Sequence, residues 1–312
     1  MLRKKEKPDL ERDRRAERMR ERFSWGALAV FVGSAFALFF FKVMGLDFWL
    51  HVKLGELIFQ SRSLPQTDPF SYILAGKALQ THYEYLSQIV FYLLFHYGGP
   101  TGFILFRVAM AIAVGGWLLS IDRKSAWPHI LLVIWGLAIG RPGFVDRPQL
   151  FTFLFFVAFL VLAFRYLSGP VEEGASFWKR SGLLWGLVGI EVLWANFHGG
   201  GHVFGFLLYG ALLGQRLFDH MIRRVPQKDL PLLLWFGLGI VAASFLSPNT
   251  YHTYRFLFQL LGESSNTLIR EWRIKPFPEY VRDCGVFWAL AVGTLLLRRK
   301  DALFCGLILG VL

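Results

Sequence analysis

The run from Trp25 to Met44, WGALAVFVGSAFALFFFKVM, is followed without interruption by Gly45-Leu46-Asp47-Phe48-Trp49-Leu50-His51. The first run is long enough to cross a membrane as a helix, so Asp47 is expected at a membrane surface. A carboxylate and an imidazole four residues apart share one face of a helix, and such groups are uncommon beside a span unless they serve a function. The alternative is that Asp47 only caps the amino end of the next helix. The polar residues on the same side of the membrane decide between the two.

The composition is that of a helical membrane protein. Hydrophobic residues make up 54% of the chain, and apolar runs of membrane-spanning length recur along it. We therefore expect an all-α, polytopic transmembrane helical bundle over residues 24–312, preceded by a charged cytoplasmic tail over residues 1–23. No small-residue cleavage site follows the first apolar run, which should remain as signal anchor and first span. The last apolar run, Ala302 to Leu312, is short for a span and suggests truncation at the carboxyl end.

Charge and cysteine content argue against two other classes of protein. The net charge of +12 lies largely where positive-inside topology places it, and nothing resembles a nucleic-acid-binding module. No nucleic acid partner is therefore expected. Cys284 and Cys305 lie in or beside apolar segments, which argues against a disulfide framework or a thiolate metal site.

Residues 45–99 are expected to form a first extracytoplasmic loop that carries interfacial helices. Leu50, Leu54 and Ile58 recur at helical spacing among polar residues, which predicts an amphipathic helix lying on the membrane. The stretch from Tyr83 to Tyr97 is apolar but short, so it either crosses the membrane or lies in the interface. The interfacial placement brings all the basic loops to the side of the basic tail, and we adopt it. The predicted spans after the first are then Gly102–Ile121, Ala126–Gly140, Leu150–Leu167, Gly182–Asn196, Val203–Phe218, Leu230–Leu246 and Gly285–Leu297.

This topology places the amino terminus in the cytoplasm and the protein in the cell inner (cytoplasmic) membrane. It also gathers the polar residues of chemical interest on the outer side, because the inner loops hold little beyond Lys, Arg and ordinary helix-end residues. Any chemistry is therefore expected at the extracytoplasmic face. The outer residues include Asp47, His51, His82, Glu84, Arg141, Asp146, Arg147, Asn196, His198, His202, Tyr254 and Arg255, with Arg270, Glu271 and Trp272 in the outer loop over residues 247–283.

Two of these arginines lie in a short outer loop, against the positive-inside tendency. Guanidinium groups at headgroup depth suit a lipid phosphate, and this is the function that we expect for Arg141 and Arg147. The alternative is a structural ion pair of Asp146 with Arg147 or with Arg141.

The stretch Asn196-Phe197-His198-Gly199-Gly200-Gly201-His202 joins two spans through glycines, which permit close approach of the backbone to a ligand. A divalent metal held by His198 or His202, with Asp47 and His51 completing the site, is one interpretation. The common alternative is a pair of hydrogen-bonded interfacial histidines. The metal requirement stays open.

The later outer loop places an acid, bases and an aromatic ring together at Ile269-Arg270-Glu271-Trp272. Sugar rings stack on aromatic faces, and their hydroxyls suit carboxylate and guanidinium groups. The alternative for Trp272 is an ordinary position in the aromatic belt of a membrane protein.

The chain resembles the GT-C superfamily of membrane glycosyltransferases over about Trp25 to Tyr280. It is similar in layout to the protein O-mannosyltransferases and aminoarabinose transferases, and more locally to bacterial multi-span proteins of this type. In this sequence the similar features are Asp47-Phe48-Trp49-Leu50-His51 with Gly55-Glu56, Pro65 to Ser71, His82-Tyr83-Glu84-Tyr85-Leu86-Ser87, Arg147-Pro148-Gln149, Trp194 to Gly200, and Glu271-Trp272.

The resemblance implies transfer of a sugar from a polyprenyl-phosphate donor to an acceptor hydroxyl at the outer face, with the glycan, lipid or protein acceptor left open. Asp47 would act as general base. The residues expected to bind substrate are His51, His82, Glu84, Arg147, Asn196, His198, His202, Tyr254, Arg255, Arg270, Glu271 and Trp272.

Two further functions stay open. One is a non-enzymatic transporter of lipid-linked sugar or an accessory membrane scaffold, for which Glu191, inside an apolar run, is a candidate residue. The other is a metal-dependent membrane hydrolase built on Asp47, His51, His198 and His202.

Overall fold

The computed structural model of this chain describes residues 25–70, 72, 76–77, 84–121, 126–169, 175–262 and 276–297. Within these ranges the regular structure is helical, which confirms the all-α prediction. The predicted tail over residues 1–23, together with His82, Arg270, Glu271 and Trp272, lies outside the described residues.

The helices follow the predicted apolar runs closely. The first helix is Trp25–Phe39. After it come α2 (Leu46–Ser61), α3 (Tyr85–Leu119), α4 (Ala126–Gly140), the 3-10 turn η1 (Arg141–Gly143), α5 (Gln149–Ser168), α6 (Ala175–Phe197), α7 (Val203–Met221), α8 (Leu230–Ser244), α9 (His252–Gly262) and α10 (Phe277–Leu297).

Two of the described helices, α3 and α5, are long and apolar enough to cross a membrane. The first helix, residues Ser181–Phe197 of α6, and α8 are shorter apolar helices. The number of spans and their orientation stay predictions.

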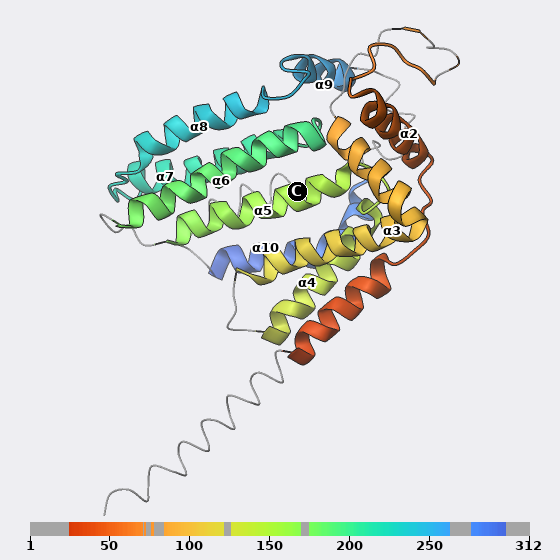
Figure 1. Cartoon of the computed structure of the whole chain (residues 1–312). Coiled ribbons are helices and arrows are strands. Elements are labelled where there is room, and N and C mark those ends of the chain that lie inside the picture. Colours follow the sequence, from red (N-terminus) through yellow and green to blue (C-terminus); the bar gives the residue numbers. More distant parts are fainter. Residues whose placement is uncertain are drawn as a thin grey trace, which may run out of the picture.

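Helix α3 consists of two segments separated by a break at Gly99. This residue has φ +57° and ψ −158°, a conformation that glycine adopts readily, and Pro100 follows it. Figure 1 shows the sharp change of direction between the orange and the yellow parts of α3. The predicted separation between Tyr83–Tyr97 and the span from Gly102 is therefore confirmed as a break in the helix.

The first half of α3 packs along α2, and the two backbones touch where they cross. A Cβ atom on Gly55 would come within 2.5 Å of the carbonyl carbon of Gln88 and nearer still to its oxygen. Near the start of α2, Phe48 is completely buried, and its ring centroid lies 4.5 Å from that of Phe103. Since neighbouring residues on a helix face different ways, burial of Phe48 turns Asp47 outward.

Helices α5, α6, α8 and α7 pack as a closed four-helix bundle, in which α5 contacts α6, α6 contacts α8, α8 contacts α7 and α7 contacts α5. Figure 1 shows α7 partly behind α6. The amino end of α5 and the carboxyl end of α6 reach the part of the molecule where α2 and the first half of α3 lie. Polar side chains from these four elements meet there.

The first apolar run does not continue as a helix to Met44 as predicted. The helix ends at Phe39, and residues 40–45 connect it to α2 without regular structure. The reason is the buried side chain of Arg107, which donates hydrogen bonds to the carbonyl groups of Phe39 and Phe41. Apolar composition alone does not show this interruption.

Candidate functional site

The outermost contact of the site joins α2 to the loop before α5. Asp47 lies in the first turn of α2, and its Oδ2 is 2.6 Å from Nη2 of Arg147. The Asp47 side chain is 50% exposed and that of Arg147 28% exposed, so water and small ligands can reach both. The N-cap of α2 is Gly45, and Asp47 lies inside the first turn of the helix. The alternative in which Asp47 serves as N-cap is therefore wrong.

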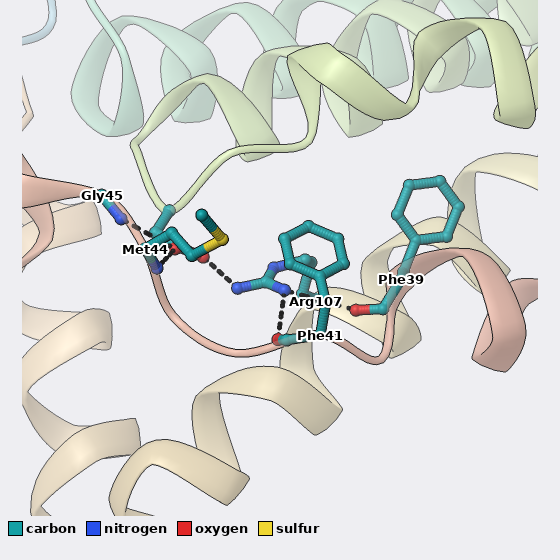
Figure 2. Close-up of polar contacts among 6 residues, drawn as sticks. Phe39, Phe41, Met44, Gly45 and Arg107 are labelled. Carbon is teal, nitrogen blue, oxygen red and sulfur yellow. Dashed lines mark hydrogen bonds and ion pairs between the residues drawn. The ribbon is translucent and has the colours of Figure 1, made fainter.

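A buried ion pair lies directly behind this contact. Arg107, on the second half of α3, is fully buried and binds Oδ1 of Asp146 through Nη2. Its Nη1 donates to the carbonyl of Phe41 at 2.8 Å and to that of Phe39 at 3.3 Å, and its guanidinium lies 3.9 Å from the centre of the Phe41 ring. Figure 2 shows the hydrogen bonds from Arg107 to both carbonyl groups as dashed lines.

The second oxygen of Asp146 holds the segment that leads into α2. Oδ2 accepts hydrogen bonds from the backbone N–H groups of Met44 at 2.8 Å and Gly45 at 3.3 Å (Figure 2). Gly45 is the N-cap of α2, and Arg147 is the neighbour of Asp146 in the chain. The same loop therefore fixes the start of α2 through Asp146 and contacts Asp47 through Arg147.

Both predicted structural pairs for Asp146 are wrong, since its ion-pair partner is Arg107. Arg141 instead donates from Nε to the carbonyl of Leu38 at 2.8 Å, and its guanidinium lies 4.9 Å from the centre of the Phe41 ring. Arg141 thus braces the end of the first helix, whereas Arg147 lies at the accessible site.

Next to the Asp47–Arg147 contact, a carboxyl group lies between two imidazoles. Glu84 is the N-cap residue of α3, and its Oε2 is 3.7 Å from Nδ1 of His51. Its Oε1 is 3.5 Å from Nε2 of His198. All three side chains are less than one fifth exposed. We call these three residues the Glu84 cluster.

Burial favours the uncharged form of each group in the Glu84 cluster. Burial, and then the charge of Asp47, raises the pKa of Glu84 to about 7, although Arg147 opposes this. Burial lowers the pKa of His51 to about 4, against the effect of Asp47. Burial, with His51 and His202 nearby, lowers the pKa of His198 to about 4. These shifts favour neutral imidazoles at neutral pH, and they place the pKa of Glu84 near 7.

A hydrogen-bonded chain orients His198. Trp194 donates from Nε1 to Oγ1 of Thr152 at 3.0 Å, and that hydroxyl lies 2.7 Å from Nδ1 of His198. Gly201 packs against all three groups, because a Cβ atom there would lie 2.6 Å from Nδ1 of His198 and 2.9 Å from Nε1 of Trp194. The glycine-rich turn therefore leaves room for the hydrogen bonds that orient His198 toward Glu84.

His202 does not join this cluster. It is the N-cap residue of α7, and its Nδ1 is 3.0 Å from Oε1 of Glu191 on α6, with both side chains completely buried. The His202 ring also makes edge contacts with the rings of Phe206 and Tyr254. The predicted set of Asp47, His51, His198 and His202 is thus divided. In the part of the chain that the structure describes, no three His, Cys, Asp or Glu side chains are arranged to hold a metal ion.

The remaining predicted residues have other positions. Asn196 accepts a hydrogen bond from the Tyr85 hydroxyl at 2.9 Å and donates to the carbonyl groups of Val192 and Leu246, so it ties three helix ends together. Tyr254 donates to the Ser244 hydroxyl at 2.5 Å. Arg255 is exposed on α9.

Comparison of the chain with protein-family models, with curated proteins and with solved structures finds no match in any of the three. The resemblance to membrane glycosyltransferases therefore stays a prediction, and the function has to be argued from the site itself.

The important residue that sequence reasoning missed is Arg107. Its signal was present, since it is a charged residue inside the predicted apolar span Gly102–Ile121. A charge in such a segment is expected to pair inside the protein and to mark a functional region. Five predicted residues, Asp47, His51, Glu84, Arg147 and His198, are brought together by the fold.

Proposed function

We infer that this protein transfers a sugar from a polyprenyl-phosphate donor to an acceptor hydroxyl at a membrane surface. The single observation that carries this proposal is the accessible Asp47–Arg147 pair, in which a carboxylate and a guanidinium lie 2.6 Å apart at a site also lined by Glu84 and His198. A guanidinium binds phosphate oxygens through charge-assisted hydrogen bonds, and a carboxylate accepts a proton from a hydroxyl.

Apolar surface supports a membrane location for this chemistry. On α8, the side chains of Leu234, Trp235 and Leu238 are more than half exposed, and on α4 those of Leu131 and Leu132 are as well. Contiguous exposed apolar side chains on helices mark contact with lipid or with another protein. Together with the two helices of membrane-spanning character, they support the multi-pass topology in the cytoplasmic membrane proposed from the sequence.

The roles of the two residues follow from their pairing. In the free protein Arg147 neutralises Asp47. The phosphodiester of the donor carries one negative charge, as the carboxylate does, and its oxygens compete with Asp47 for the guanidinium, so donor binding would release Asp47 as it engages Arg147. Asp47 then takes the proton of the acceptor hydroxyl as its oxygen forms a bond to the anomeric carbon. The bond between that carbon and the phosphate oxygen breaks, and its electron pair leaves with the polyprenyl phosphate.

Preorganisation is the contribution of the buried ion pair. Arg107 and Asp146 hold the start of α2 against the residue before Arg147, so Asp47 and Arg147 need little rearrangement to react. A positioned base contributes about 10²–10⁴-fold to the rate, and Arg147 stabilises the charge that develops on the leaving phosphate.

The test is sugar transfer by purified protein in lipid nanodiscs that contain a labelled polyprenyl-phosphate sugar, offered a panel of hydroxyl acceptors. Asp47→Asn should lower the rate about 10²–10⁴-fold, whereas Glu56→Gln on the same helix should leave it unchanged. Glu56 is the matched control, because its partner Lys53 lies at the surface, 2.5 Å away. Equal rates for Asp47→Asn and wild type would overturn the assignment. Movement of the labelled lipid across the bilayer without transfer would instead favour the transporter.

A further inference from the structure

The site holds two carboxyl groups in opposite environments. Asp47 is half exposed and in contact with the Arg147 guanidinium. Glu84 is largely buried, and its two carboxyl oxygens lie 3.7 Å and 3.5 Å from the imidazoles of His51 and His198. Two titratable groups whose surroundings push their protonation apart divide acid and base roles between them. Asp47 lies against a guanidinium, whereas burial raises the pKa of Glu84 to about 7.

We propose that Glu84 is the proton-exchange group of this site, taking up through His51 the proton that Asp47 removes from the acceptor and releasing it to water. This inference rests on the proposed function, because it assigns the fate of the proton that sugar transfer liberates. It concerns a second carboxyl that binds no donor phosphate.

The geometry provides the path. His51 lies one helical turn after Asp47 on α2, so the two side chains share a face, and the Asp47 charge acts on both His51 and Glu84. His51 Nδ1 is buried, and its nearest acidic group is Glu84 Oε2 at 3.7 Å. A neutral imidazole passes a proton by accepting at one nitrogen and donating from the other.

Charges from every element around Glu84 fit this role. Asp47 and His51 belong to α2, Arg147 precedes α5, and His198 follows α6. The chain from Trp194 through Thr152 occupies Nδ1 of His198, which leaves Nε2 directed at Glu84. When Thr152 donates to Nδ1, the proton of His198 lies on Nε2 and stabilises the charged form of Glu84.

The balance of each step is simple. Protonated Asp47 gives its proton to one nitrogen of His51 as the other nitrogen gives a proton to the Glu84 carboxylate. Asp47 is again a carboxylate, and His51 is neutral in its other tautomer. Protonated Glu84, whose side chain is 18% exposed, loses the proton to outer water. Return of His51 to its first tautomer completes the cycle without an oxidant or reductant.

The proton site can be tested without any transfer activity, by pH-difference infrared spectroscopy of the purified protein in nanodiscs. A carboxyl band that titrates near pH 7 in wild type and in Glu56→Gln, and is lost in Glu84→Gln, supports the proposal. If Glu84→Gln does not fold, Thr152→Val is used, and a shifted titration of the same band supports it equally. The proposal is overturned if the band is the same in every variant, or if no carboxyl band titrates in this pH range.

The relay is tested by the pH dependence of transfer. Glu84→Gln should remove the inflection near pH 7 from the rate profile, whereas Asp47→Asn should lower the rate at every pH. An unchanged profile in Glu84→Gln overturns the relay. If the wild-type protein transfers no sugar from any donor, the proposed function fails, and the infrared result alone then decides whether Glu84 is the proton site.

Discussion

Asp47 and Arg147 form an ion pair with 2.6 Å between Oδ2 and Nη2, although one belongs to the first turn of α2 and the other precedes α5. Because both side chains are partly exposed, the pair contributes little to stability, about 0–1 kcal/mol. A pair that is weak and accessible is easily exchanged for a ligand. This property leads to the first prediction.

Variants of the two partners should change phosphate binding in opposite directions. Arg147→Met removes charge-assisted hydrogen bonds that contribute about 1.5–3 kcal/mol, so the Kd for polyprenyl phosphate should rise roughly 10–100-fold. Asp47→Asn removes the competitor for Arg147, so the Kd should fall by up to about fivefold even though transfer is lost. Binding is measured by native mass spectrometry or fluorescence in nanodiscs.

Arg165→Met is the control for these measurements. Arg165 lies in the last turn of α5, the helix that Arg147 precedes, and it donates a hydrogen bond to the Ser120 hydroxyl rather than contacting the site. Its substitution should leave the Kd unchanged. Weaker binding by Asp47→Asn would show that Asp47 supports the phosphate site instead of competing for it.

Removal of Arg107 should destabilise the protein far more than removal of an exposed partner. Arg107→Met leaves Asp146, which is 2% exposed, as a buried charge without its guanidinium, which costs about 3–5 kcal/mol. Lys53→Met breaks an exposed pair and should cost less than about 1 kcal/mol. Loss of helical circular dichroism with heating in detergent measures both.

The double variant Arg107→Met/Asp146→Leu separates two roles of Asp146. An isolated buried ion pair is often replaceable by apolar residues without loss. Here the second oxygen of Asp146 also accepts from Met44 and Gly45, so both N–H groups would lose their acceptor. The double variant should therefore remain destabilised, and recovery of wild-type stability would show that these backbone hydrogen bonds contribute little.

Much of the fold follows from the sequence because apolar periodicity fixes helices. The predicted bounds of α4 agree with the structure, and those of α5 and α7 differ by a few residues. The separation before Gly102 was predicted from the short length of the apolar stretch Tyr83–Tyr97 and from the distribution of basic loops, and the structure has its break at Gly99. The predicted end of the first helix was wrong, because the helix is ended by a tertiary contact with Arg107 and not by a local sequence signal.

The site was predicted less well, for a physical reason. The sequence predicted Asp47, Glu84 and His198 on one side of the membrane, and the structure brings them together at one end of the helices. The side of the membrane stays a prediction. The predicted side of the membrane does not show which side chains contact one another, because the contacts depend on the rotation and packing of the helices. His202 was therefore grouped with His198, whereas the start of α7 directs it to Glu191.

Gly201 should be intolerant of any side chain. In Gly201→Ala the new methyl group would lie within 2.6 Å of His198 Nδ1 and closer still to Thr152 Oγ1, so His198 must move away from its aimed position. The expected loss of stability is about 1–3 kcal/mol. Gly210→Ala, on α7, meets no atom within 4 Å and should be neutral or stabilising by up to about 1 kcal/mol. Similar melting temperatures for the two variants in the same detergent would contradict the packing described around His198.

The stability of the protein should depend on pH through Glu84 with a definite sign. The pKa of Glu84 is raised by burial from 4.5 to about 7, so the folded state favours the protonated form. Its favourable contribution is fully present below about pH 4.5, the unfolded value, and is lost as the pH rises through 7. Burial lowers the pKa values of His51 and His198 to about 4, so these residues act in the opposite direction. Their favourable contribution to stability is lost as the pH falls through about 4.

Glu84→Gln isolates the first of these effects, because glutamine is uncharged at every pH. The wild-type protein bears a buried charge above pH 7 that the variant lacks, so the variant should gain about 2–3 kcal/mol relative to wild type between pH 4.5 and pH 8. Melting temperatures of both proteins, measured in one detergent across this range, provide the check, with Glu56→Gln as the exposed control. Parallel curves for Glu84→Gln and wild type would mean that Glu84 does not change its protonation on folding, and the buried carboxyl between His51 and His198 would then be an ordinary hydrogen-bond acceptor.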